Sequence, residues 1–139
     1  MKEALITVYT KQIYTSHEDT SSEKFKGKLA EKEGNIYIIY TEENKDKTIT
    51  TNQIKVDKEG RVYIRRMGST RSKLCFDKNK PYTTFYQTPH GSMELTFIPS
   101  IVDYQFRSTQ HRINLEYDIY MGENKLSRNI YCIQVNTST

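Results

Sequence analysis

The chain has 139 residues and a net charge of +4, with two cysteines and no tryptophan. This length suits a single domain with its own core, and two cysteines are too few for a disulfide-based secreted domain, so we expect Cys75 and Cys132 to be free thiols. The first residues lack the pattern of a signal peptide, and no apolar run reaches the ~18 residues of a membrane helix, so we expect a cytoplasmic protein without membrane contact.

Apolar and polar residues alternate with a period of two along almost the whole chain, which predicts β-strands. Clusters of Gly, Asn, Asp and Ser separate the strands, as is typical of turns. In chain order the predicted strands cover residues 4–15, 23–32, 36–42, 48–57, 61–67, 72–76, 82–88, 92–98 with a bent continuation over 101–106, 111–120 and 125–135. We expect one domain over residues 1–135 and a frayed tail over residues 136–139.

Short strands joined by hairpin-length connections are typical of all-β sandwiches and barrels. The meander order favours a single antiparallel up-and-down β-barrel of about 8–10 strands. We expect such a barrel to have no exposed sheet edges, because its first and last strands pair.

The alternation also predicts which side chains face the barrel interior. On the strand at 23–32, Phe25, Gly27 and Leu29 share one face and lysines occupy the other. The inward residues of the other strands are Ile36, Ile38, Tyr40, Ile54, Val56, Val62, Ile64, Leu74, Phe76, Met93, Leu95, Phe97, Ile113, Leu115, Tyr117 and Ile119. Such residues either fill the interior or line a cavity for a small ligand, and the sequence leaves both possibilities open.

Arg66 is the most unusual inward residue, because it alternates with Val62 and Ile64. A guanidinium inside a barrel needs a counter-charge, so Arg66 either anchors an anionic ligand or lies at the barrel mouth, hydrated or paired with a carboxylate. Tyrosine combines an apolar ring with a polar tip, which suits the wall of a binding cavity. The predicted ligand-binding residues are Arg66, Tyr40, Tyr82, Tyr86 and Tyr117.

The segment 61–73 is a second candidate site, because it contains several cations and no acidic residue. Its predicted nucleic-acid-binding residues are Arg61, Arg65, Arg71 and Lys73. Beside exposed tyrosines, such a hairpin could make a weak contact with a phosphate backbone. The alternative interpretation is a solvated hairpin tip.

No motif in the sequence indicates catalysis or metal binding. His17, His90 and His111 lack metal-ligand spacing, and phosphate-binding loops and nucleophile elbows are absent. We therefore expect a non-enzymatic binding protein without cofactor or metal, a monomer or weak homo-oligomer whose ligand is small and amphipathic or anionic. The alternatives are a nucleic-acid-associated module and a protein–protein adaptor with a fully packed barrel.

Two sequence elements resemble the YwiB-like family of bacterial proteins of unknown function. They are Ile-x-Arg-x-Gly at residues 64–68 and Tyr-x-Thr-Pro-x-Gly-x-x-x-Leu at residues 86–95. The resemblance implies a lipocalin-like (calycin-type) barrel in a bacterial cytoplasmic protein, and it implies no established activity, cofactor or catalytic residue. The chain departs from true lipocalins because it has no Trp for their Gly-x-Trp element. Pro89 and Gly91 also have a structural explanation, since a stiff turn with a positive φ fixes the register of two strands.

Overall fold

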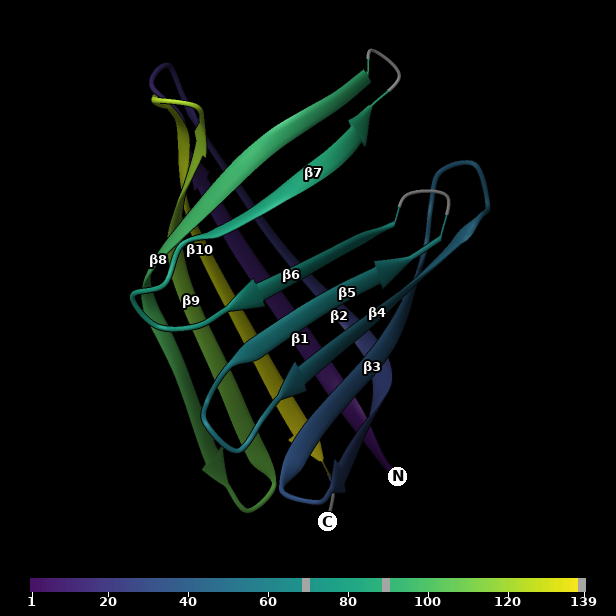
Figure 1. The fold of residues 1–139 in the computed structure, drawn as a ribbon. Coiled ribbons are helices and arrows are strands. Elements are labelled where there is room, and N and C mark those ends of the chain that lie inside the picture. The colour runs from purple at the N-terminus through teal and green to yellow at the C-terminus, as the bar shows by residue number, and fades with distance from the viewer. Residues whose placement is uncertain (69–70, 89–90, 138–139) are drawn as a thin grey trace.

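The computed structural model describes residues 1–68, 71–88 and 91–137, with no side-chain description for residues 87 and 88. These residues form ten strands (Figure 1). The strands are β1 (Lys2–Ile13), β2 (Glu18–Lys32), β3 (Asn35–Glu43), β4 (Ile49–Val56), β5 (Val62–Met67), β6 (Ser72–Phe76), β7 (Tyr82–Thr88), β8 (Gly91–Arg107), β9 (Gln110–Met121) and β10 (Asn124–Thr137). The described residues contain no helix that is long and apolar enough to cross a membrane.

All ten strands belong to one antiparallel sheet with the order β6-β5-β4-β3-β2-β1-β10-β9-β8-β7. Apart from β6 and β7, strands that follow one another in the chain pair with each other. The first strand, β1, also pairs with β10 over a ladder that runs from Ala4–Thr137 to Ile13–Arg128. The predicted all-β, up-and-down barrel is therefore confirmed, and it is consistent with the lipocalin-like type.

The barrel is not fully closed, because no ladder among the described residues joins β6 to β7. The two hairpins β5–β6 and β7–β8 diverge from their connection at residues 77–81 toward the opposite end of the barrel (Figure 1). The hydroxyl of Tyr82 donates to the Lys73 carbonyl across this seam at 3.4 Å. The expectation of a barrel without edges is wrong, because β6 and β7 each keep one edge that no described strand pairs with.

The core follows the predicted alternation. Ile38, Ile54, Val62, Ile113 and Leu115 have no exposed surface, and every predicted inward residue with an apolar side chain belongs to the core or packs against it. On β2, Leu29 is buried while the alternating lysines are exposed, as predicted. These residues form one apolar core inside the barrel.

Several strands are longer than predicted, and β2 begins at Glu18 instead of residue 23. Pro99 and Ser100 do not end a strand, because β8 continues through them with a register shift between Pro99 and Ile101. Such a bulge accommodates the missing amide hydrogen of a proline. At the C-terminus, β10 continues to Thr137, whose amide donates to the Thr109 carbonyl at 2.8 Å. The predicted tail therefore does not begin at residue 136, and residues 138–139 lie outside the described part.

The turn before β8 can be compared with its prediction only in part. Gly91 has a φ of 116°, so the positive φ expected at this position is present. Pro89 and His90 lie outside the described residues.

The inward face changes from apolar to polar along the barrel axis, and the change occurs at the same end in every strand of one wall. On β4, Val56 and Ile54 are followed by Asn52 and Thr50, all buried. Register aligns Asn52 with Tyr40 on β3 and with Arg66 on β5. The strand pairing therefore gathers polar inward side chains at one mouth of the barrel.

Candidate functional site

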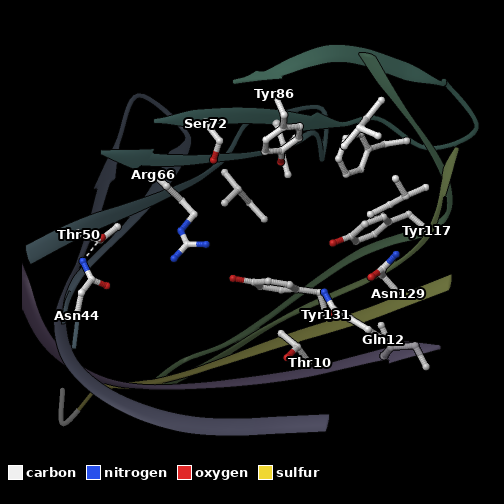
Figure 2. Close-up of a pocket in the computed structure, with 16 residues that line it drawn as sticks. Thr10, Gln12, Asn44, Thr50, Arg66, Ser72, Tyr86, Tyr117, Asn129 and Tyr131 are labelled. Atoms are coloured by element: carbon white, nitrogen blue, oxygen red, sulfur yellow. Dashed lines mark hydrogen bonds between the residues drawn. The ribbon is translucent and has the colours of Figure 1, made fainter. Parts of the chain in front are cut away.

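A cavity of about 610 Å³ occupies this polar mouth (Figure 2). Its walls come from both sides of the open seam, since β5 and β6 face β7, β8, β9 and β10 across it. The lining residues are Thr10, Gln12, Asn44, Thr50, Ile64, Arg66, Ser72, Leu74, Tyr86, Leu95, Phe97, Tyr117, Ile119, Asn129, Ile130 and Tyr131. This volume and this mixture of apolar and polar residues are typical of small-molecule sites.

Aromatic rings cover the apolar part of the cavity wall. The ring centroid of Phe97 lies 5.7 Å from that of Tyr117 and 6.4 Å from that of Tyr86. Tyr117 also packs against Phe76, with ring centroids 4.7 Å apart. Burial raises the pKa values of Tyr86 and Tyr117, so both phenols stay protonated at neutral pH.

Arg66 reaches into the cavity from β5, and Figure 2 shows it opposite Tyr131 of β10. Its side chain is 50% exposed, which places the guanidinium at the mouth. Nη2 donates to Glu42 Oε1 at 3.1 Å, and Asn52 Nδ2 donates to the same oxygen at 2.8 Å. The cation at the mouth is thus held by a carboxylate from β3, and a buried amide from β4 holds that carboxylate.

Tyr40 does not line the large cavity. It is 4% exposed, and its ring stacks on Phe25 with centroids 4.7 Å apart. Burial, followed by the electrostatic interaction and the hydrogen bond with Tyr131, raises the pKa of Tyr40. Tyr40, Tyr131, Glu42 and Arg66 line a separate cavity of about 180 Å³.

The structure therefore divides the predicted ligand-binding set. Arg66, Tyr86 and Tyr117 line one cavity, Tyr40 lines the smaller one, and Tyr82 lies at the seam with its hydroxyl on the Lys73 carbonyl. Only three of the five residues predicted from the sequence share the large cavity.

Asn129 is a polar residue of the cavity that was not predicted. It is 3% exposed, and its Nδ2 donates to Ser127 Oγ at 2.9 Å. Its Oδ1 is buried and has no hydrogen-bond partner among the described residues. A buried acceptor without a partner destabilises a folded protein, and such groups often mark functional sites.

Tyr131 and Glu42 were not predicted either. Alternation along β10 from Val135 and Ile133 places Tyr131 and Asn129 on the inward face, and this pattern is visible in the sequence. Glu42 follows Tyr40 on the inward face of β3 by the same rule. Their proximity to Arg66 depends on the pairing of strands distant in sequence, which the local pattern does not specify.

The predicted basic hairpin does not form one surface. Arg61 pairs with Asp57 and Glu59, each at 2.7 Å, and Arg66 faces the cavity. Arg65 and Lys73 lie opposite one another on the outer face, and Arg71 is exposed. The acidic residues just before the segment therefore neutralise one end of it.

Comparison with known proteins supports the fold and the family. A model described as a domain of unknown function (DUF1934) matches residues 6–133, and no curated protein matches the chain. The crystal structure of the ywiB protein from Bacillus subtilis is similar, with a TM-score of 0.85, 19% identity and coverage of 99% of this chain and 93% of that one. This likeness confirms the predicted YwiB-like fold and resemblance. The chain belongs to the DUF1934 family, whose function is unknown.

Proposed function

We propose that the protein is a non-enzymatic, cytoplasmic binding protein whose barrel mouth holds a small amphipathic ligand. The observation that carries this proposal is the change of the inward face from apolar to polar at one end, around a cavity of about 610 Å³. A polar lining has no role in packing a core, whereas it orients a ligand whose apolar part rests on the aromatic wall. The cavity also counts against an adaptor with a fully packed interior.

The position of Arg66 is the reason to expect an anionic group on the ligand. Only its Nη2 is bonded within the described residues, and the exposed fraction of its side chain leaves the guanidinium accessible from the mouth. Guanidinium groups bind carboxylate, phosphate and sulfonate oxygens through several N–H donors. Glu42 holds Arg66 in place, and a ligand anion would share the guanidinium with it.

We propose a binding protein and not an enzyme because of the titratable residues that line the cavity. Among its described lining residues these are Arg66, Tyr86, Tyr117 and Tyr131. Burial raises the pKa of each tyrosine, so none of the phenols exchanges a proton near neutral pH. Such phenols act as neutral hydrogen-bonding groups.

Two fluorescent probes with one aromatic skeleton test the proposal. Anilinonaphthalenesulfonate is anionic, and N-phenylnaphthylamine lacks the sulfonate. Both should bind, and Arg66→Leu should weaken the sulfonate probe by about tenfold, or about 1.4 kcal/mol, without weakening the neutral one. Arg65→Leu is the matched control, because Arg65 is the adjacent cation on the outer face, and it should change neither affinity.

A blocked cavity provides the second control. Ser72→Trp puts an indole into the cavity from β6, whereas Lys73→Trp puts it on the outer face. The first variant should lose both probes and the second should keep them. Equal binding by the two variants would contradict the site, and native mass spectrometry of the protein from lysate would then test for a ligand held elsewhere.

A further inference from the structure

Six cations are gathered on the outer face of β2 to β6. They are Lys24, Lys26, Lys28, Lys55, Arg65 and Lys73. None of them forms an ion pair within the described residues. Glu3 on β1 lies opposite Lys28, and Glu43 lies at the end of β3. Asp57 and Asp77 follow β4 and β6, where they pair with Arg61 and Lys80.

The opposite wall of the barrel is different. On β9 and β10, Arg128 pairs with Glu116 at 3.2 Å and with Asp118 at 3.3 Å, and Lys125 also pairs with Asp118. The charges of this cluster are therefore neutralised locally. The unpaired cations give the β2–β6 wall a positive field that the net charge of +4 does not reveal.

Strand pairing sets the cations in rows. One row runs Lys28–Ile39–Gln53–Arg65–Lys73 across five strands. Arg65 and Lys73 are directly opposite, an arrangement that repels unless an anion lies near both. Along β2, the alternating lysines are about 7 Å apart, so they form a second line of positive charge perpendicular to the row.

Aromatic side chains lie within this basic face. Tyr37, Lys55 and Tyr63 are cross-strand neighbours in the next row. The Lys55 ammonium lies 5.8 Å from the Tyr37 ring centroid and 5.6 Å from that of Tyr63. Half-exposed tyrosine rings beside cations are the elements with which proteins bind single-stranded nucleic acids, where bases stack on rings and phosphates meet cations.

We propose that the outer face of β2 to β6 binds single-stranded nucleic acid, at a site separate from the cavity. A single strand can follow a convex sheet, whereas a duplex cylinder and a barrel touch over only a short length. The predicted hairpin contributes Arg65 and Lys73 to this face, while Arg61 is neutralised by Asp57 and Glu59 and Arg66 lines the cavity. The lysines of β2 and Lys55 supply the rest.

The test uses fluorescence anisotropy with a labelled oligothymidine of about 15 nucleotides. The face variant carries Lys26→Gln, Arg65→Gln and Lys73→Gln. The control variant carries Lys78→Gln, Arg107→Gln and Arg112→Gln, which removes the same charge from exposed positions elsewhere. The face variant should lose about tenfold or more in affinity, and the slope of log affinity against log salt should shrink by about 2. Equal losses in the two variants would overturn the proposal.

Two further binding measurements test whether the partner is a nucleic acid. An abasic oligonucleotide of the same length should bind about tenfold more weakly than oligothymidine, because it cannot stack. If the abasic strand or polyglutamate binds as tightly, the face recognises charge alone and the proposal fails. The cavity variant Ser72→Trp should bind oligothymidine as the unmodified protein does, so this result does not depend on the proposed function.

Discussion

The two ends of the barrel are built from the same strands but differ in what fills them. At the packed end, the inward positions of β4, β5 and β10 hold Ile54, Val62 and Ile133, none of which has exposed surface. At the mouth, the inward positions of β4 and β10 hold the buried polar residues Thr50 and Asn129. The strand period fixes the direction of each side chain, and residue type then assigns one end to stability and the other to binding.

The largest expected contrast compares two inward residues of β4. Ile54→Ala removes a fully buried side chain and should lower the free energy of unfolding by about 2–5 kcal/mol. Thr50→Ala removes the hydroxyl that accepts from Asn44 Nδ2 at 2.9 Å, and should lower it by about 1 kcal/mol. Urea denaturation measures both. Equal losses would show that the mouth supports the fold as much as the packed end does.

At Asn129 we expect a smaller change in the free energy of unfolding, and in the opposite direction. The double variant Ser127→Ala/Asn129→Leu removes the unpartnered acceptor together with the group bonded to Nδ2. Replacing both partners with apolar groups should raise the free energy of unfolding by about 1 kcal/mol. Asn129→Leu alone should raise it less, because it leaves the Ser127 hydroxyl buried without its partner. A less stable double variant would mean that the polar mouth contributes to folding.

The smallest effect concerns pH and His111 at the packed end. His111 is 4% exposed, its Nδ1 lies 2.8 Å from the Tyr104 hydroxyl, and burial lowers its pKa. Glu31 opposes this shift and Lys2 adds to it. Because the unfolded state binds a proton more readily, stability should fall as the pH drops below about 6.5.

Thermal melts across this pH range measure the effect. His111→Gln should flatten the pH dependence between about 6.5 and 5.5, where carboxylates contribute little. The exposed His17 is the control, and His17→Gln should leave the dependence unchanged. An unaltered slope in His111→Gln would exclude His111 as the group responsible.

Much of the fold could be predicted from the sequence because strands obey a local rule. The alternation of apolar and polar residues predicted nearly every strand. It also predicted that Arg66 follows Val62 and Ile64 on the inward face. The exception is Pro99–Ser100, where a proline that interrupts the pattern lies in a bulge within β8. Local pattern alone does not distinguish a bulge from a strand end.

The candidate site could be predicted only in part, because it depends on register between distant strands. The contact of Arg66 with Glu42 spans 24 residues, and Tyr131 comes from the opposite wall. Tyr82 and Tyr86 share one face of β7, yet only Tyr86 lines the cavity, since the divergence of β6 and β7 leaves Tyr82 at the seam. The basic outer face likewise appears only when β2 is placed beside β3, β4, β5 and β6.

The seam between β6 and β7 also affects how the chain folds. The polypeptide is continuous across the seam, while the hydrogen-bonded sheet is continuous between β10 and β1, which hold the two ends of the chain side by side (Figure 1). A circular permutant that joined the ends and opened the connection at residues 77–81 would place all ten strands in sheet order. Its contact order would be lower, because the β1–β10 ladder would become a local hairpin, and the barrel would fold faster.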